Sequence, residues 1–208
     1  MTCRHDAVGA ARWSAQARSP RYVAGTRAPA SWGMLMLILT EGIFFSLLFA
    51  SYWYIRSGSE TWPQNGIQAP DLLIPSIASA ILLSSSLPMF WADAAIRRGD
   101  QLQLRAGLAI AFVMGAAFLL VQLNEYSKLD FKPQTDAYSS LFIVITAFHG
   151  AHLFVGLLMN LFTQGRAWMG QFSERRFLAV QNVSWYWHFV DAVWVFIFGF
   201  LYIAPHFT

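Results

Sequence analysis

The stretch WYWHFVDAVWVFIFGF, Trp185 to Phe200, decides the fold class of this chain. It consists almost entirely of aromatic and aliphatic side chains, yet it holds His188 and Asp191 three residues apart. Residues at this spacing share one face of a helix, so the two polar side chains would form a single stripe. An ionisable group at the centre of a lipid-embedded helix costs about 2.5 to 3.5 kcal/mol on an insertion scale. We therefore expect the stripe to face protein rather than lipid.

The composition of the chain indicates that lipid surrounds most of it. Of its 208 residues, 56% are hydrophobic and only 12% are charged, whereas an ordinary soluble domain has roughly 25% charged residues. The length permits one domain. The single cysteine, Cys3, excludes an internal disulfide and a thiolate metal cluster.

Crossing the hydrocarbon takes about 20 mostly apolar residues. Five segments of the chain meet this requirement, at about residues 30–55, 72–91, 106–123, 138–162 and 185–203. All five must be helical, because an isolated strand would leave its backbone groups unpaired in lipid. The sequence thus predicts an all-α integral membrane bundle of five transmembrane helices in residues 30–208, preceded by a basic cytoplasmic tail at residues 1–29.

Arginine and lysine are distributed unevenly between the two ends of the predicted helices. One end holds eleven of the fourteen, in the tail, residues 92–105 and residues 163–184. Because basic residues accumulate on the cytoplasmic side, this places the N-terminus inside and the C-terminus outside. The tail lacks the apolar segment of a signal peptide and any basic patch with interleaved aromatic residues. We expect it to lie at an anionic leaflet and expect no nucleic-acid partner.

Aromatic and small residues predict the depth and the contacts of the helices. Aromatic residues mark headgroup level, which places Tyr52–Tyr54 at the end of the first span and Trp185–Trp187 at the start of the fifth. Small residues at four-residue spacing let helix backbones approach each other. We expect such contacts at Gly107, Ala111 and Gly115 and at Ser76, Ala80 and Ser84.

Six ionisable residues lie within the predicted spans or at their rim, and these are the candidate functional residues. They are Glu41, Glu125, His149, His152, His188 and Asp191. One interpretation is that they pair with one another and hold the helices together. A second is a metal site of His149, His152 and His188, although H-x-x-H without a further carboxylate or cysteine cluster is a weak signal.

A third interpretation is a proton path, since chains of Glu, Asp and His conduct protons through membranes. The second and third spans add only serines, Gln122 and Asn124, which are too few polar side chains for a continuous path across the bilayer. A local proton buffer, or a polar contact between helices, fits this count better.

Five motifs in this order resemble subunit III of the haem-copper oxidases, most closely that of cytochrome c oxidase. They are TEGIFFSLLFASYWY (40–54), TWPQNGI (61–67), VQLNEY (121–126), FHGAHLFVG (148–156) and WYWHFVDAVWVFIF (185–198). The resemblance covers about residue 31 to the C-terminus. Full-length members have seven helices, and this chain matches the last five, as short bacterial members do. The resemblance therefore implies that another chain would have to supply part of the wall of the family's phospholipid cleft.

The resemblance implies a non-catalytic subunit of a respiratory oxidase that binds no cofactor itself. Haem and copper would lie in the catalytic subunit I, its main contact, with subunit II nearby. In the family, subunit III supports sustained turnover and proton uptake, and binds phospholipid. By the resemblance, Glu41 would be a buried glutamate that tunes inactivation during turnover. His188 and Asp191 would form an inward-facing polar contact that holds the helices together. Glu125, His149 and His152 match further polar positions of the family motifs.

Other identities remain open from the sequence. Subunit III of a quinol oxidase is also built from five helices, and a related small membrane protein accompanies nitric oxide reductase. An independent metal-binding membrane enzyme or transporter is the alternative from another class, and metal retained by the isolated chain would distinguish it. The expected location is the bacterial inner membrane, with an organellar membrane as the alternative.

Overall fold

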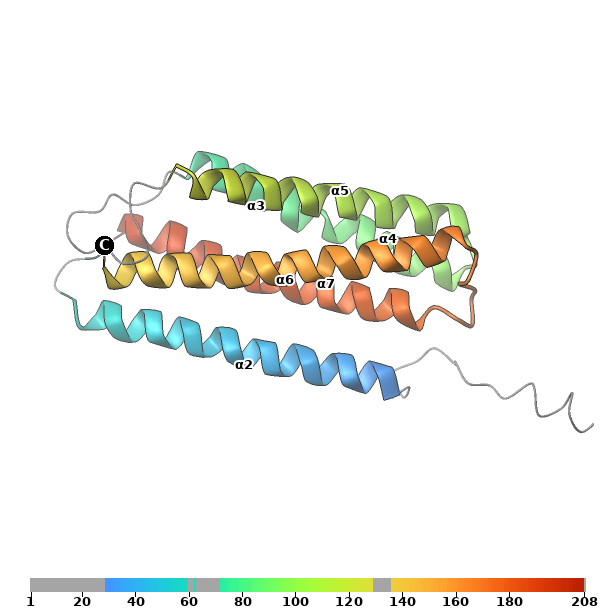
Figure 1. Ribbon diagram of the computed structural model, residues 1–208, viewed down its shortest axis with the longest axis horizontal. Coiled ribbons are helices and arrows are strands. Elements are labelled where there is room, and N and C mark those ends of the chain that lie inside the picture. Colours follow the sequence, from blue (N-terminus) through green and yellow to red (C-terminus); the bar gives the residue numbers. More distant parts are fainter. Residues whose placement is uncertain (1–28, 60–61, 63–71, 129–135, 208) are drawn as a thin grey trace, which may run out of the picture.

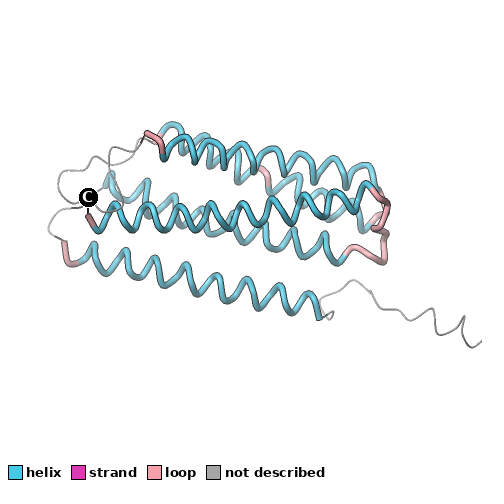
Figure 2. The backbone as a smooth tube through the Cα atoms, viewed as in Figure 1, coloured by secondary structure: helices cyan, strands magenta, loops and turns pink. Residues whose placement is uncertain are grey.

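The computed structural model describes residues 29–59, 62, 72–128 and 136–207, and this part of the chain is predominantly helical (Figures 1 and 2). Its elements are α2 (Pro29–Ser57), α3 (Leu73–Ser84), α4 (Ser86–Arg97), α5 (Gln101–Tyr126), α6 (Ala137–Trp168), α7 (Leu178–Ile197), the π-helical turn η2 (Phe198–Ile203) and the 3₁₀ turn η3 (Ala204–Phe207). Five segments are long and apolar enough to cross a membrane, with α3 and α4 forming one of them. The expected all-α bundle of five membrane helices is confirmed, and the predicted tail falls outside the described residues.

The helices extend further at one end of the bundle than hydropathy predicted. α4 continues to Arg97, α5 begins at Gln101 and α7 begins at Leu178, seven residues before Trp185. The first turns of α7 contain Gln181, Asn182 and Ser184, whose polarity ends the hydrophobic run early. As a result, Trp185–Trp187 lie within the helix and do not open it, and Trp187 is buried in the bundle.

Side-chain caps determine where α5 and α6 begin. The carboxylate of Asp100 accepts hydrogen bonds from the backbone N–H groups of Leu102 and Gln103, at 3.1 and 3.0 Å. Asp136 accepts from the backbone N–H of Ser139 at 2.7 Å. Each aspartate satisfies N–H groups that have no partner within the first turn of the helix, which is the usual role of an N-cap.

The second membrane span is broken between α3 and α4 (Figure 2). Pro88 lies in the first turn of α4, where it has no N–H for the carbonyl of Ser84 and its ring crowds that carbonyl. Two serine hydroxyls of this span, one at the break and one within α3, face α7. Ser85 accepts a hydrogen bond from the indole N–H of Trp187 at 2.9 Å, and Ser79 accepts one from Trp194 at 2.8 Å.

α7 is the central helix, since it contacts α2, α3, α4 and α6. Gly115 of α5 makes room for Trp187, because a Cβ added there would lie 2.8 Å from the indole ring. A Cβ at Gly107 would lie 2.6 Å from the carbonyl oxygen of Pro88. The contacts expected at Gly107 and Gly115 are thus confirmed. The prediction for α3 is wrong, because Ser76 and Ala80 are exposed and Ser79 is buried instead.

The two ends of the bundle differ in charge, while its sides are apolar. The start of α2, the α4–α5 turn and the α6–α7 link lie together at one end (Figure 1). That end carries the arginines Arg97, Arg98, Arg105, Arg166, Arg175 and Arg176. Between the ends, large aliphatic and aromatic side chains point outward, such as Val113, Leu120 and Phe162 at 64%, 67% and 68% exposure. Such a surface is suited to lipid.

Candidate functional site

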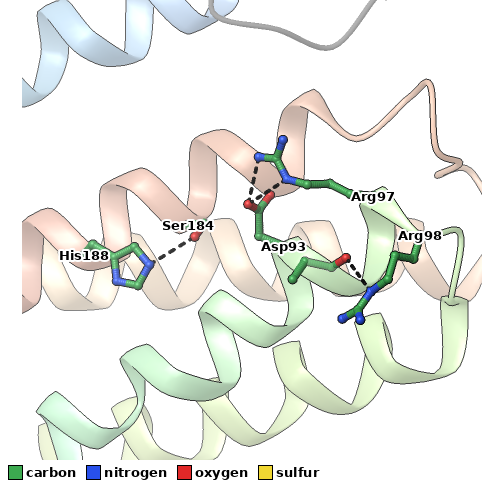
Figure 3. Close-up of polar contacts among 6 residues, drawn as sticks. Asp93, Arg97, Arg98, Ser184 and His188 are labelled. Carbon is green, nitrogen blue, oxygen red and sulfur yellow. Dashed lines mark hydrogen bonds and ion pairs between the residues drawn. The ribbon is translucent and has the colours of Figure 1, made fainter.

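Four side chains of α4 and α7 form a hydrogen-bond chain beside the break between α3 and α4. Ser184 Oγ lies 3.3 Å from Nε2 of His188 (Figure 3), and Nδ1 of His188 lies 3.0 Å from Oγ of Ser86. Ser86 in turn donates to Oδ2 of Asp191. Since the Ser86 hydroxyl hydrogen is used for Asp191, Ser86 accepts from Nδ1–H of His188, and Nε2 then accepts from Ser184. The chain therefore has one consistent direction, from Ser184 to Asp191.

The residues of this hydrogen-bond chain differ in how deeply they are buried. Asp191 is only 4% exposed, and its second oxygen, Oδ1, has no hydrogen-bond partner among the described residues. His188 and Ser86 are half-buried. The structure thus places His188 and Asp191 close together, as their spacing predicted. The two side chains are linked through Ser86 of α4 rather than directly, and only Asp191 is buried.

Closer to the basic end, the contact between α4 and α7 continues with charged groups (Figure 3). Arg97 forms an ion pair with Asp93 at 2.9 Å, and its guanidinium carbon lies 4.8 Å from the ring centroid of Phe177. Phe177 immediately precedes α7, so Arg97 fixes the start of α7 against the end of α4. We call the whole line of contacts from Arg97 to Asp191 the α4–α7 seam.

Glu41 and His152 form a second polar contact, between α2 and α6. Nε2 of His152 lies 2.9 Å from a carboxylate oxygen of Glu41, and Nδ1 lies 2.7 Å from the carbonyl oxygen of Phe148. The Glu41 side chain is 32% exposed and that of His152 is 16% exposed. The expectation that Glu41 is buried in the bundle is therefore wrong, because α2 is a peripheral helix and Glu41 lies at its edge.

The geometry of this pair requires a shared proton. A carbonyl oxygen only accepts, so Nδ1 of His152 must carry a hydrogen that it donates to Phe148. The contact between Nε2 and Glu41 then needs one more proton, either on Nε2 or on the carboxyl group. The 2.9 Å contact thus joins two groups that can each accept the proton.

His149 does not join His152, although the two are three residues apart. Its side chain is 1% exposed, and its ring packs beside those of Trp194 and Phe118, with centroids 4.9 and 6.3 Å away. Neither of its ring nitrogens has a hydrogen-bond partner among the described residues. His149 points into the core and His152 points toward α2, so the H-x-x-H motif does not converge on one point.

The remaining candidate, Glu125, lies at the rim of the bundle opposite the basic end. It forms an ion pair with Lys128 at 2.8 Å, and both side chains reach the surface. Across the described ranges, no group of three or more His, Cys, Asp and Glu residues lies close enough to hold a metal ion. The six candidates thus divide into the α4–α7 seam, the Glu41–His152 pair, the buried His149 and the rim pair of Glu125.

A cavity of about 590 Å³ opens at the basic end, between the start of α2, the end of α6 and the start of α7. Its lining includes Arg166, Arg176, Phe172, Asn182 and Ala30. Arg166 is held in place by Gln171, to which its Nε donates at 2.9 Å, and its guanidinium carbon lies 5.3 Å from the Phe172 ring centroid. The cavity combines positive charge with an apolar wall, which suits an amphiphilic anion.

Sequence reasoning missed three members of the seam. Ser86 and Ser184 complete the hydrogen-bond chain, and Asp93 pairs with Arg97. A signal existed for Ser86, because it belongs to the run SSSLP in an otherwise apolar span, where a proline marks a break and serines can bridge helices. Ser184 and Asp93 were assigned to links between helices, so they were not considered.

Comparison with known proteins agrees with the motifs. The family model described as cytochrome c oxidase subunit III matches residues 21–205. Cytochrome c oxidase subunit 3 of Thermostichus vulcanus is 36% identical over 179 residues, which cover 84% of this chain and 87% of that protein. The probable subunit 3 of Rickettsia prowazekii is 36% identical over 188 residues, covering 82% and 67%. The subunit 3 of the insect Locusta migratoria is 35% identical over 178 residues, also covering 82% and 67%.

The match spans α2 to η3, and therefore includes every element that contributes to the α4–α7 seam and to the Glu41–His152 pair. The five membrane helices and the relatives together make this a multi-pass membrane protein. The resemblance expected from the motifs is confirmed, and the chain belongs to the cytochrome c oxidase subunit III family.

Proposed function

We propose that this chain is the non-catalytic subunit III of a respiratory cytochrome c oxidase, where it packs against the catalytic haem-copper subunit I, with subunit II nearby. The observation that carries this proposal is the family match over residues 21–205, which includes both polar contacts in the membrane. Haem and copper belong to the partner subunits in this proposal. The names of the relatives favour cytochrome c over quinol as the electron donor.

Two features support a role in the durability of the complex and in its proton uptake. The α4–α7 seam joins two membrane spans through partly buried hydrogen bonds, which stabilises the subunit that the catalytic chain would contact. The Glu41–His152 pair holds one proton at membrane depth between two groups that can both accept it. Such a pair can take up and return a proton locally, without a continuous path across the bilayer.

The arginine-rich end supports an orientation with the N-terminus in the cytoplasm of a bacterial cell, since basic residues accumulate on that side. The cavity with Arg166 and Arg176 supports binding of an anionic phospholipid. Its two guanidinium groups match a phosphate group, and Phe172 and Ala30 would contact the start of the acyl chains.

A spectrum of the purified complex tests the proposal. The protein would be purified in mild detergent through a tag on this chain, and its reduced-minus-oxidised visible spectrum and metal content measured. We expect haem and copper in the complex and neither in the chain after it has been separated from its partners. Stoichiometric metal in the separated chain would contradict the proposal and would make the histidines ligand candidates. Purification without any haem protein would also contradict it.

A further inference from the structure

The α4–α7 seam contains a buried carboxyl group whose ionised form has little to stabilise it. Asp191 is 4% exposed, and its Oδ2 accepts a hydrogen bond from the Ser86 hydroxyl. Its Oδ1 has no partner in the part of the chain that the structure describes. A buried carboxylate is normally stabilised by an opposite charge or by several hydrogen bonds. A proton bound to Asp191 would remove the charge and leave Oδ1 as a neutral carbonyl oxygen.

The carboxylate and histidine side chains of the helices packed against α7 have contacts elsewhere. α3 has none, and those of α2, α4 and α6 are Glu41 paired with His152, Asp93 paired with Arg97, and His149 beside the ring of Trp194. The arginines of these helices lie in their last turns, at Arg56, Arg97 and Arg166. The titratable group that is linked to Asp191 is therefore His188 of its own helix, through Ser86.

The hydrogen-bond chain can run in either of two directions, because serine and histidine can each donate and accept. With Asp191 ionised, Nδ1–H of His188 donates to Ser86, and Ser86 donates to Asp191. When a proton supplied by water binds Nε2 of His188, the Nδ1 proton can pass to Ser86 Oγ while the Ser86 proton passes to Asp191 Oδ2. The Ser184 hydroxyl then turns to accept from Nε2–H, with the two atoms 3.3 Å apart (Figure 3). One proton enters at Nε2, one is gained by Asp191, and the imidazole and both hydroxyls are neutral again.

The geometry of the chain fits a site that holds a proton rather than a path across the bilayer. Nδ1 of His188 lies 3.0 Å from Ser86 Oγ, and Ser86 contacts Asp191 directly, so each step is a transfer along an existing hydrogen bond. The imidazole of His188 is half-buried, whereas Ser184 and Asp191 are buried. At the inner end, the unpartnered Oδ1 offers the proton no further step among the described residues.

We propose that Asp191 is a proton-binding site that is loaded through His188 and Ser86. This site goes beyond the proposed function, in which the Glu41–His152 pair supports proton uptake, and it is formed by this chain alone. Glu41 meets His152 directly at the edge of the bundle. Asp191 is instead separated from the half-buried imidazole by a serine, and both groups must move a proton before it is loaded. Loading should therefore depend on an imidazole at position 188.

Time-resolved infrared spectroscopy of the purified complex tests this site. The complex is prepared through a tag on this chain, a light pulse releases protons from a caged acid, and the carbonyl band of protonated aspartic acid is followed. Asp191→Asn should remove this band. Asp191→Glu keeps a carboxyl group, so its band should no longer shift when the protein contains isotope-labelled aspartate, which assigns the band even if Asp191→Asn does not assemble.

His188→Gln tests the route of the proton. The glutamine amide can still donate to Ser86 and accept from Ser184, but it does not readily pass a proton from one side to the other. A positioned acid–base group typically accelerates a proton transfer at least about a hundredfold, so we expect loading to be slower by about this factor, with the same final amplitude. Glu125→Gln is the matched control, since it removes a carboxyl group at the rim, and it should load at the unsubstituted rate.

Each other outcome overturns the proposal. An aspartate band that persists in Asp191→Asn, or no such band in the unsubstituted protein, excludes a proton site at Asp191. Equal loading rates in His188→Gln and the unsubstituted protein exclude the route, and a purely structural role for His188 would give less complex with this unchanged rate. If no haem protein co-purifies, the proposed function fails, whereas the aspartate band still tests Asp191 in the purified chain.

Discussion

The α4–α7 seam and the attachment of α2 show two ways of placing polar groups in a membrane. In the seam, Asp191 is 4% exposed, and α7 is also joined to the second span by indole–serine hydrogen bonds to Ser85 and Ser79. On the other side, Glu41 is 32% exposed at the edge of a helix of 29 residues that buries only Ser31, Phe45 and Tyr52. The central helix therefore encloses its polar groups in the bundle, whereas the peripheral helix leaves its Glu41–His152 pair partly exposed at the surface.

α2 is nevertheless attached at three depths. Asn182 donates to the carbonyl of Ala30 at 3.3 Å near the start of α2, and His152 meets Glu41 in the middle. At the other end, the Tyr52 hydroxyl donates to the carbonyl of Phe200 at 3.0 Å. Aromatic contacts accompany these polar ones, since ring centroids lie 5.1 Å apart for Phe45 and His152 and 5.5 Å apart for Phe49 and Phe200. Most of α2 nevertheless stays at the surface. We expect substitutions in the seam to affect stability more than substitutions along α2.

The largest effect is expected where α5 makes room for Trp187. Gly115→Ala would place a Cβ 2.8 Å from the indole ring, and such overpacking typically costs about 1–3 kcal/mol. The matched control is Gly165→Ala on α6, where an added Cβ meets nothing within 4 Å. Thermal unfolding in detergent measures both. We expect a lower melting temperature for Gly115→Ala only, and equal melting temperatures would show that the contact between α5 and Trp187 is not tightly packed.

Asp191→Asn should have the next largest effect. Asparagine keeps one oxygen that can accept from Ser86, but its amide group adds two N–H donors to a buried site. We expect the stability of the folded subunit to fall by about 1 kcal/mol, the value of one hydrogen bond. The loss should appear as less subunit retained in the purified oxidase and faster decline of activity, with little change in the initial rate of oxygen consumption. An equal loss of initial rate with unchanged assembly would argue against a structural role.

Glu41→Gln should have a smaller effect on stability and a specific effect on turnover. Hydrogen bonds between membrane helices average about 0.6 kcal/mol, and the partly exposed pair with His152 should not exceed this value. Because glutamine cannot exchange a proton with Nε2, we expect a shorter active lifetime during steady turnover with an unchanged initial rate. Glu125→Gln is the control, since it makes the same chemical change at the rim. An unchanged lifetime for Glu41→Gln would remove this residue from the proposal.

The smallest effect on stability is expected for Arg166→Gln, at the cavity beside the start of α2. We expect the melting temperature to stay the same while the purified complex loses a tightly held anionic phospholipid, because one of the two guanidinium groups is gone. Phospholipid content by mass spectrometry measures the loss. Arg98→Gln serves as the control, since Arg98 donates to the carbonyl of Ala94 on its own helix and does not line the cavity. If the unsubstituted protein, Arg166→Gln and Arg98→Gln all carry the same amount of phospholipid, the cavity is not a phospholipid site.

Much of the fold could be predicted from the sequence, because a membrane helix is determined by local properties. Length and hydropathy were sufficient to identify five spans, and the six arginines of that side that belong to the described residues lie at one end of the bundle. The predictions failed where local polarity and tertiary position disagree. Gln181, Asn182 and Ser184 lie in a true helix, and Ser76 and Ala80 are small residues without a neighbouring helix.

The candidate site could be predicted only in part, because pairing depends on which helices become neighbours. The spacing of His188 and Asp191 was informative, since both lie on one helix. The separation of His149 from His152 was not predictable, because a rotation of about 100° per residue lets residues three apart diverge toward two different neighbours. The partial exposure of Glu41 likewise follows from the peripheral position of α2, which hydropathy does not report.

The central position of α7 has a consequence for the biosynthesis of the chain. α7 leaves the ribosome after the other four described membrane spans, yet Trp187 and Trp194 supply the hydrogen bonds that Ser85 and Ser79 accept in the broken second span. The four earlier spans are therefore inserted before the helix around which they pack exists. Until the C-terminal segment enters the membrane, the intermediate has an open centre, which makes it a natural substrate for membrane chaperones and quality-control proteases.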